Sequence, residues 1–280
     1  MSLCDILFVK VMENSNLDIQ NKGHLHPITI LSDKIASIFT KLGFDIVSDR
    51  ELEREWYNFD ALNVPKDHPS RDMQDTFFLK LPENEYGKAV LRTHTSSVQI
   101  RYMTDKMKEI RNKSQENPNI EKEIFPIAIV CPGKVYRNEA TDATHEAQFH
   151  QVEGLLVGEN ISVANLKAVL EKFFSELFGK DIDVLLRSSY FPFVEPGLEV
   201  AMKCFKCEGA GCNICKNTGY IEIMGAGMVH PKVLENCGID SRKYSGFAFG
   251  SGLDRIAMLK YGLDDVRFLY NGDLRVVNQF

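Results

Sequence analysis

Apolar residues recur at three- and four-residue steps in three segments of the chain, which is the spacing of an amphipathic helix. The first segment ends at Gly43 and contains Ile28, Leu31, Ile35, Ile38, Phe39 and Leu42. The second covers 162–178 and is followed by Gly179, a typical C-terminal stop. The third begins after Gly252, with Ile256, Leu259 and Tyr261 on its inner face. We therefore expect helices in these three places.

Short runs rich in β-branched and aromatic residues lie between the helical segments, at 125–131, 134–136, 149–157, 182–186 and 220–224. They do not alternate regularly with helices, and the run 149–157 is nearly continuously apolar, as in a central strand. This order predicts an α+β fold with a mainly antiparallel sheet rather than a doubly wound one. The polar segment 109–122 is expected to be a solvated helix or loop, and 1–25 an N-terminal tail.

Composition places the chain among ordinary globular proteins, with 280 residues, 44% of them hydrophobic and 26% charged. No run of 18 apolar residues occurs, and the first residues lack the features of a signal peptide. We therefore expect a cytoplasmic protein without a membrane partner. The net charge of −6 is unusual for a protein that binds nucleic acid alone. Either nucleic acid is not a partner, or other chains supply much of the contact.

Four of the seven cysteines form two CxxC pairs that are separated by four residues: Cys204, Cys207, Cys212 and Cys215. A tight cluster of this kind indicates a metal site rather than a disulfide framework in a reducing compartment. Four thiolates suit tetrahedral Zn²⁺, and they leave no open position for catalysis. We expect a structural zinc in a small insertion over 203–219. An empty or oxidised cluster and an iron–sulfur cluster are the alternatives.

Two polar segments could carry chemistry, although the chain has neither a GxxxxGK[ST] loop nor a GxGxxG loop that opens a βαβ unit. In the first, 136–154, Gln151 and Glu153 occupy alternate positions of an apolar strand. Unpaired polar groups there are costly, so these two need a partner such as an ammonium group or a buried salt bridge. In the second, 250–255, two glycines precede a helix that carries Arg255. By itself this segment fits a tight packed turn.

Both segments resemble motifs 2 and 3 of the class II aminoacyl-tRNA synthetases. RNEATDATHEAQFHQVEG and GFAFGSGLDRIAMLKYG are similar in particular to the phenylalanyl-tRNA synthetase α subunit of bacterial type. Further blocks occur in the family's order at 58–78, 91–103, 190–196 and 225–234 and in the closing NGDLRVVNQF. The resemblance implies a catalytic domain over 26–280, with an antiparallel sheet flanked by helices.

The resemblance also implies ATP-dependent activation of L-phenylalanine and its transfer to tRNA(Phe). In that reading Arg137 clamps the α-phosphate, Phe149 stacks on adenine, and Arg255 holds the far phosphate. Glu139 and His145 contact ATP from the motif 2 loop. Mg²⁺ accompanies ATP, through Glu195 and Glu222.

The amino-acid pocket follows from the same resemblance. Phe191 and Phe193 pack around the substrate ring, although by themselves they would be taken for core aromatics, and Ala248 lies at the bottom of the pocket. The remaining residues implied for amino-acid binding are His94, Ser96, Gln99, Gln151, Glu153 and Ala226. Such a pocket rejects an added hydroxyl by only about a hundredfold, which the family corrects with an editing site on a separate β subunit.

This sequence departs from the family in two ways. It has no counterpart of the long N-terminal helical arm that reaches tRNA, and Ser251 replaces a larger apolar residue. The charge of −6 fits a catalytic core whose tRNA contacts come mostly from that arm and from the β subunit of an α2β2 heterotetramer. The alternatives are a stand-alone class II paralogue for another amino acid and a zinc-bearing regulatory module without catalysis. The intact FPF and GFAFG segments disfavour the first, and the retained motif residues disfavour the second.

Overall fold

The structure, a computed structural model, describes residues 25–73 and 75–280. Apart from Leu25, the tail expected over 1–25 lies outside the described residues. Seven strands form the main sheet: β1 (Asp45–Ile46), β5 (Ile127–Tyr136), β6 (Gln148–Gly158), β7 (Val184–Phe191), β8 (Val194–Lys203), β9 (Tyr220–Val229) and β10 (Ser245–Gly252).

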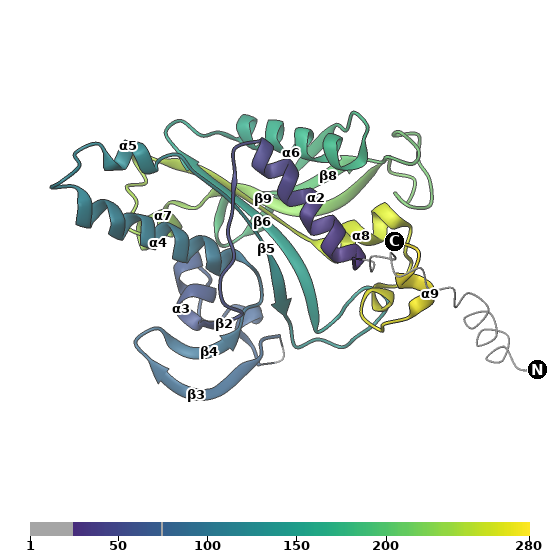
Figure 1. The fold of residues 1–280 in the computed structure, drawn as a ribbon, viewed down its shortest axis with the longest axis horizontal. Helices are drawn as coiled ribbons and strands as arrows, with labels where there is room; N and C mark the ends of the chain where they lie inside the picture. The colour runs from purple at the N-terminus through teal and green to yellow at the C-terminus, as the bar shows by residue number, and fades with distance from the viewer. Residues whose placement is uncertain (1–24, 74) are drawn as a thin grey trace, which may run out of the picture.

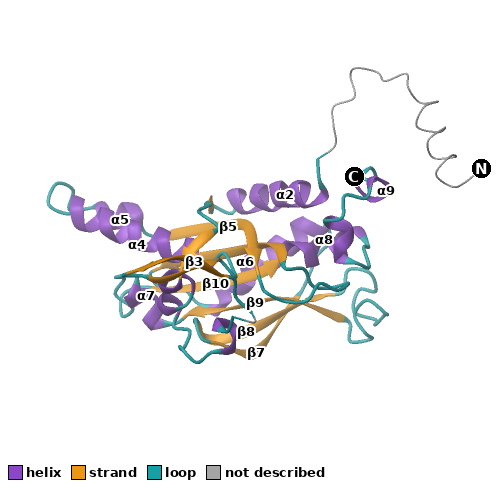
Figure 2. Cartoon of the chain, turned by 90° about the horizontal axis from the view of Figure 1, so that it is seen from below, coloured by secondary structure: helices purple, strands orange, loops and turns teal. Residues whose placement is uncertain are grey.

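The strands of the main sheet lie in the order β1-β5-β6-β10-β9-β8-β7, and they form the middle layer of the molecule (Figure 2). Only the short β1 runs parallel to its neighbour, and the other pairs are antiparallel. The expected α+β fold with a mainly antiparallel sheet is confirmed. Strands β6 and β10, which carry the two motif segments, are direct neighbours in the centre of the sheet.

Helices cover both faces of the main sheet. On one face α2 (Pro27–Lys41), α6 (Val163–Phe178) and α8 (Leu253–Tyr261) pack into a large core with residues from most of the strands. On the other face lie α3 (Glu55–Asn58), α4 (Ser96–Lys113) and α7 (Pro231–Asn236), around a second core. The short helix α5 (Ile120–Ile124) follows α4 in the chain, and α9 (Leu274–Val277) lies near the C-terminus.

A second, smaller sheet of β2 (Leu52–Arg54), β4 (Gly87–Leu91) and β3 (Phe78–Asn84) lies beside α3, apart from the main sheet (Figure 1). Glu53 in β2 has a side chain only 1% exposed, and it accepts two hydrogen bonds from the Arg101 guanidinium of α4, at 2.5 and 2.8 Å. This buried ion pair ties the small sheet to α4. The arrangement holds α4 between the two sheets.

Aromatic packing fixes how β6 and β10 meet. Phe249 of β10 is buried and stacks on Phe39 of α2, with ring centroids 5.3 Å apart, and Phe39 stacks in turn on Phe173 of α6. Phe249 pairs with Gly154 of β6, where a Cβ atom would lie 2.1 Å from the Phe249 ring. Glycine is therefore required at 154, because any side chain would displace this aromatic stack.

The three expected helices are present, as α2, α6 and α8, with Gly179 as the left-handed C-cap of α6. The expected strands are present too, but 125–131 and 134–136 form one strand, β5, rather than two. The interpretation of 250–252 as part of a turn before a helix is wrong, because these residues end strand β10. The segment 109–122 contains the last turn of α4 and the start of α5.

Candidate active site

A cavity of about 700 Å³ opens over β6, β9 and β10, on the sheet face that carries α4 and α7. Residues that are far apart in the sequence line it, from the loop before α4, the motif 2 segment and the three central strands. Most of the residues implied by the family resemblance are among them: His94, Ser96, Gln99, Arg137, Glu139, Gln151, Glu153, Phe191, Phe193, Ala226 and Ala248.

Glu153 is the buried charge of the cavity, with a side chain that the start of α4 holds in place. Its Oε1 accepts from the Thr95 amide at 3.1 Å, and its Oε2 accepts from the Ser96 hydroxyl and from Gln99 Nε2 at 3.3 Å. Burial raises the pKa of the Glu153 carboxyl to about 7, although these donors and the guanidinium of Arg137 act to lower it. The groups around Glu153 therefore do not fully stabilise its ionised form, and an added cation would stabilise it further.

Two further acceptors in the cavity wall have no partner. His94 donates from Nε2 to the Asn58 carbonyl at 3.0 Å, which leaves Nδ1 as a buried acceptor without a hydrogen bond. Burial and the nearby Arg137 lower the pKa of His94 to about 4, so its ring is neutral at pH 7. Gln151 Oε1 is likewise buried and unpaired. Together with Glu153, these groups suit a cationic donor such as a primary ammonium group, which has three N–H bonds.

Other parts of the cavity wall are apolar. The rings of Phe191 and Phe193 are stacked with centroids 5.9 Å apart, and Ala248 of β10 contributes a methyl group to the wall. Five aliphatic residues of the wall were not predicted from the sequence: Ile100, Met103, Leu155, Val229 and Val233. Their periodicity marks them only as buried, which holds for a core and a pocket wall alike.

The cavity wall also carries the cationic side chain of Arg137. Its guanidinium lies 5.0 Å from the ring centroid of Phe149, and its Nε donates to the Thr93 carbonyl at 3.4 Å. Phe149, His145 and Arg255 are not in the cavity wall. His145 is engaged by its own loop, with Nδ1 3.1 Å from the carboxylate of Asp142.

Two acidic residues predicted for magnesium are not brought together. Glu195 follows Val194, which pairs with Val229, whereas Glu222 pairs with Ala201. The separation of six residues along the ladder corresponds to about 20 Å at about 3.3 Å per residue. A single ion therefore cannot bind both carboxylates. The strand register that separates them is not visible in the sequence.

Three polar residues of the cavity wall were not predicted from the sequence, His68, Ser70 and Asp75. All three belong to the block 58–78, which matched the family without any residue being singled out. His68 Nδ1 lies 2.7 Å from the Ser70 hydroxyl. The match of the block 58–78 to the family was the sequence feature that could have indicated these residues.

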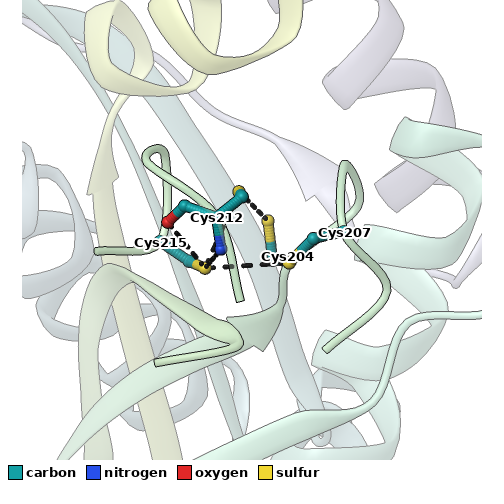
Figure 3. Close-up of side chains that lie close together, drawn as sticks. All are labelled: Cys204, Cys207, Cys212 and Cys215. Carbon is teal, nitrogen blue, oxygen red and sulfur yellow. Dashed lines mark hydrogen bonds between the residues drawn. The ribbon is translucent and has the colours of Figure 1, made fainter. Parts of the chain in front are cut away.

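The four clustered cysteines form the connection between β8 and β9, and their sulfur atoms point toward one another (Figure 3). All four sulfurs lie within 4.8 Å of each other. The pairs Cys204–Cys212 and Cys212–Cys215 are 3.8 Å apart, and Cys207–Cys215 is 3.7 Å. A tetrahedral zinc with Zn–S bonds of about 2.3 Å would place its sulfurs about 3.8 Å apart. The cluster therefore has the dimensions of a zinc site.

Backbone amides also prepare these sulfurs for a cation. The amide of Gly211 donates to Cys207 Sγ at 3.2 Å, and that of Cys212 donates to Cys215 Sγ at 3.1 Å. Burial acts to raise the pKa of Cys215, but the hydrogen bonds, first that from Cys212, lower it to about 6. The turns are tight, since a Cβ at Gly219 would lie 2.5 Å from the Gly209 carbonyl oxygen.

Comparisons with known proteins identify the family to which the chain is similar. The family model for tRNA synthetases class II core domain (F) matches residues 13–280. The phenylalanine–tRNA ligase alpha subunit of Staphylococcus carnosus is 52% identical over 258 residues, which are 92% of this chain and 67% of that protein. Proteins of the same name from Macrococcus caseolyticus and Streptococcus agalactiae are 52% and 51% identical, and the chain spans 67% and 69% of their lengths.

The raised pKa of Glu153 predicts a pH dependence of folding stability. The carboxyl binds its proton more tightly in the folded protein, with a pKa of about 7 against an ordinary 4.5. Its contribution is therefore full below about pH 4.5 and is lost as the pH rises through 7, by about 3 kcal/mol. Between pH 5 and pH 8, urea unfolding should show the wild type losing about 2–3 kcal/mol more stability than Glu153→Gln, which keeps the shape of the side chain and shares the opposite contribution of His94. Parallel pH profiles of the two proteins would contradict it.

Proposed function

The chain belongs to the family of phenylalanine–tRNA ligase alpha subunits, which are class II aminoacyl-tRNA synthetases, and we propose that its cavity is where L-phenylalanine is activated. ATP and phenylalanine would form phenylalanyl-adenylate there, and the phenylalanyl group would then pass to tRNA(Phe). The observation that carries this proposal is that one cavity is lined both by incompletely paired hydrogen-bond acceptors and by aromatic rings and methyl groups.

Phenylalanine fits both kinds of wall at once. Its ammonium group would donate to Glu153, Gln151 and His94, whose acceptors are otherwise incompletely paired. Its ring would lie beside Phe191 and Phe193, where edge-to-face contacts between aromatic rings are favourable. The carboxylate would then lie near the guanidinium of Arg137, which lines the same cavity.

Arg137 and the other residues proposed to contact ATP supply the groups for adenylate formation. The amino-acid carboxylate attacks the α-phosphorus of ATP in line, and pyrophosphate leaves. Arg137 would neutralise charge that develops on the α-phosphate, through a bidentate and preorganised guanidinium. We propose that Phe149 stacks on adenine, with Glu139, His145 and Arg255 around the remaining parts of ATP. No covalent enzyme intermediate is needed, because positioning and charge neutralisation carry the reaction.

Class II synthetases use Mg²⁺ with ATP, and the ion would neutralise phosphate charge. Because Glu195 and Glu222 lie at opposite ends of the β8–β9 ladder, they do not form a shared site, and neither has a step assigned to it. Glu195 is exposed, and its carboxylate lies 3.3 Å from His230 Nε2.

An alpha subunit implies a partner subunit, and we propose an α2β2 heterotetramer that binds tRNA(Phe) jointly. The net charge of −6 supports a division in which other chains supply much of the positive surface for tRNA. Among the described residues, no helix is long and apolar enough to cross a bilayer. A cytoplasmic location is proposed from the family, whose product is used in translation.

We further propose that the cysteine cluster holds one structural zinc. The spacing of the sulfurs and the amide donors support Zn²⁺, which would join the two CxxC turns. The cluster is continuous with the rest of the protein, because Cys204 and Cys215 belong to the main core. The Phe205 ring stacks on Phe178 of α6, with centroids 5.0 Å apart. The metal would therefore stabilise the contact between the β8–β9 connection and α6.

Phenylalanine-dependent exchange of pyrophosphate into ATP, measured in complex with a β subunit, tests the proposed activity. Arg137→Ala should lower the exchange by at least about a hundredfold, which is the usual loss when one preorganised donor is removed. Arg242→Ala is the matched control, because Arg242 is exposed, pairs with Asp240 and is not part of the cavity wall. Exchange that depends on another amino acid would favour the paralogue alternative, and no exchange at all would favour the regulatory module.

Elemental analysis of protein purified without added metal should find one zinc per chain. Cys207→Ser should lose the metal and lower the melting temperature, whereas Cys237→Ser, a buried cysteine of the other core, should keep the zinc. Stoichiometric iron in the wild type, or full zinc content in Cys207→Ser, would overturn the assignment.

A further inference from the structure

A buried carboxylate joins three separate segments behind the cavity. Asp254, in the first turn of α8, is only 5% exposed. Its Oδ2 accepts from the backbone amide of His150 in β6 at 2.8 Å, and its Oδ1 accepts from the hydroxyl of Tyr270. One side chain thus connects a central strand, the start of a helix and the C-terminal part of the chain.

The contact with His150 continues the pairing of β6 with β10 beyond its last residue. The ladder between these strands ends at Gln151, opposite Gly252, and α8 begins at the next residue. His150 precedes Gln151 on β6, just outside the ladder. Its amide donates a hydrogen bond to the Asp254 carboxylate instead of to a strand carbonyl. Asp254 therefore fixes the position at which α8 leaves the sheet, because a buried amide must be paired.

Tyr270 closes the network. It follows the 3₁₀ helix Val266–Leu269, and its ring lies parallel to the His150 imidazole, at 5° and 6.2 Å between centroids. The Tyr270 hydroxyl donates to Asp254 and lies 3.1 Å from His150 Nδ1, from which it can accept. Burial raises the pKa of the Tyr270 hydroxyl well above its ordinary value, so the phenol stays protonated and remains a donor.

Two of the groups proposed to contact ATP are direct chain neighbours of this network. Phe149 precedes His150 on β6, and Arg255 follows Asp254 on α8. Because side chains alternate along a strand, Phe149 lies on the sheet face opposite to His150. Any movement of α8 relative to β6 would therefore move Arg255 relative to Phe149.

We infer that Asp254, Tyr270 and His150 form a positioning network for ATP. The network holds Arg255 at a fixed distance from Phe149, the residue proposed to stack on adenine. The inference rests on the proposed function. None of the three residues lines the cavity, and Tyr270 lies nearly ten residues beyond the end of α8. The C-terminal part of the chain thus takes part in nucleotide binding through the network.

Steady-state pyrophosphate exchange of the complex with a β subunit tests the inference. Tyr270→Phe leaves Asp254 Oδ1 without its donor and frees α8 to shift, so KM for ATP should rise about tenfold, the effect of one hydrogen bond to a charged group. KM for phenylalanine and kcat should each change less than about twofold, because the cavity wall is untouched. Tyr261→Phe is the matched control, since Tyr261 packs on Phe280 at the end of α8 and outside the network.

Asp254→Asn provides a second variant of similar shape, for which the same rise in KM for ATP alone is expected. Melting temperatures separate this effect from a general loss of folding, which would raise both KM values or lower the active fraction. A wild type without phenylalanine-dependent exchange would overturn the proposed function itself. A wild type that is active, with Tyr270→Phe and Asp254→Asn both keeping the wild-type KM for ATP, would overturn only the positioning network.

Discussion

The candidate site depends on one buried carboxylate in the centre of the main sheet. Glu153 must be paired where it lies, and the start of α4 provides the Thr95 amide, the Ser96 hydroxyl and the Gln99 amide for it. These contacts fix α4 against β6 and so define one wall of the cavity. They do not fully offset the cost of burial, since the pKa stays raised to about 7. A cationic group beside Glu153 would therefore stabilise its ionised form, and an amino-acid ammonium group can supply that charge.

The opposite face of the same strands supplies the rigidity that this arrangement needs. The Phe249 ring stacks on Phe39 of α2, and it occupies the space that Gly154 of β6 leaves by having no side chain. Asp254 extends the pairing of β6 with β10 into α8. Binding groups on one face are thus held by packing on the other, so that the polar residues of the cavity can remain partly unpaired without collapsing onto each other.

An element could be predicted from the sequence where its residue pattern is distinctive. The helices α2 and α6 were predictable because their apolar stripes are strong, and the cysteine cluster because its spacing is metal-like. Helix α4 was missed because the side it buries at its start is polar, with Ser96 and Gln99 in place of aliphatic residues. Strand β10 was missed because its glycines suggested a turn. Which residues share a wall, and that Glu195 and Glu222 lie far apart, depends on strand register, which a single sequence does not contain.

Calorimetric binding to the complex with a β subunit, without ATP, tests the central claim most directly. L-phenylalanine should bind at least about a hundredfold more tightly than 3-phenylpropanoate, which keeps the ring and the carboxylate but lacks the ammonium group. In Glu153→Gln this preference should largely disappear, mainly through weaker binding of phenylalanine. Equal affinities of the wild type for the two compounds would contradict the account, because the buried acceptors would then have no part in recognition.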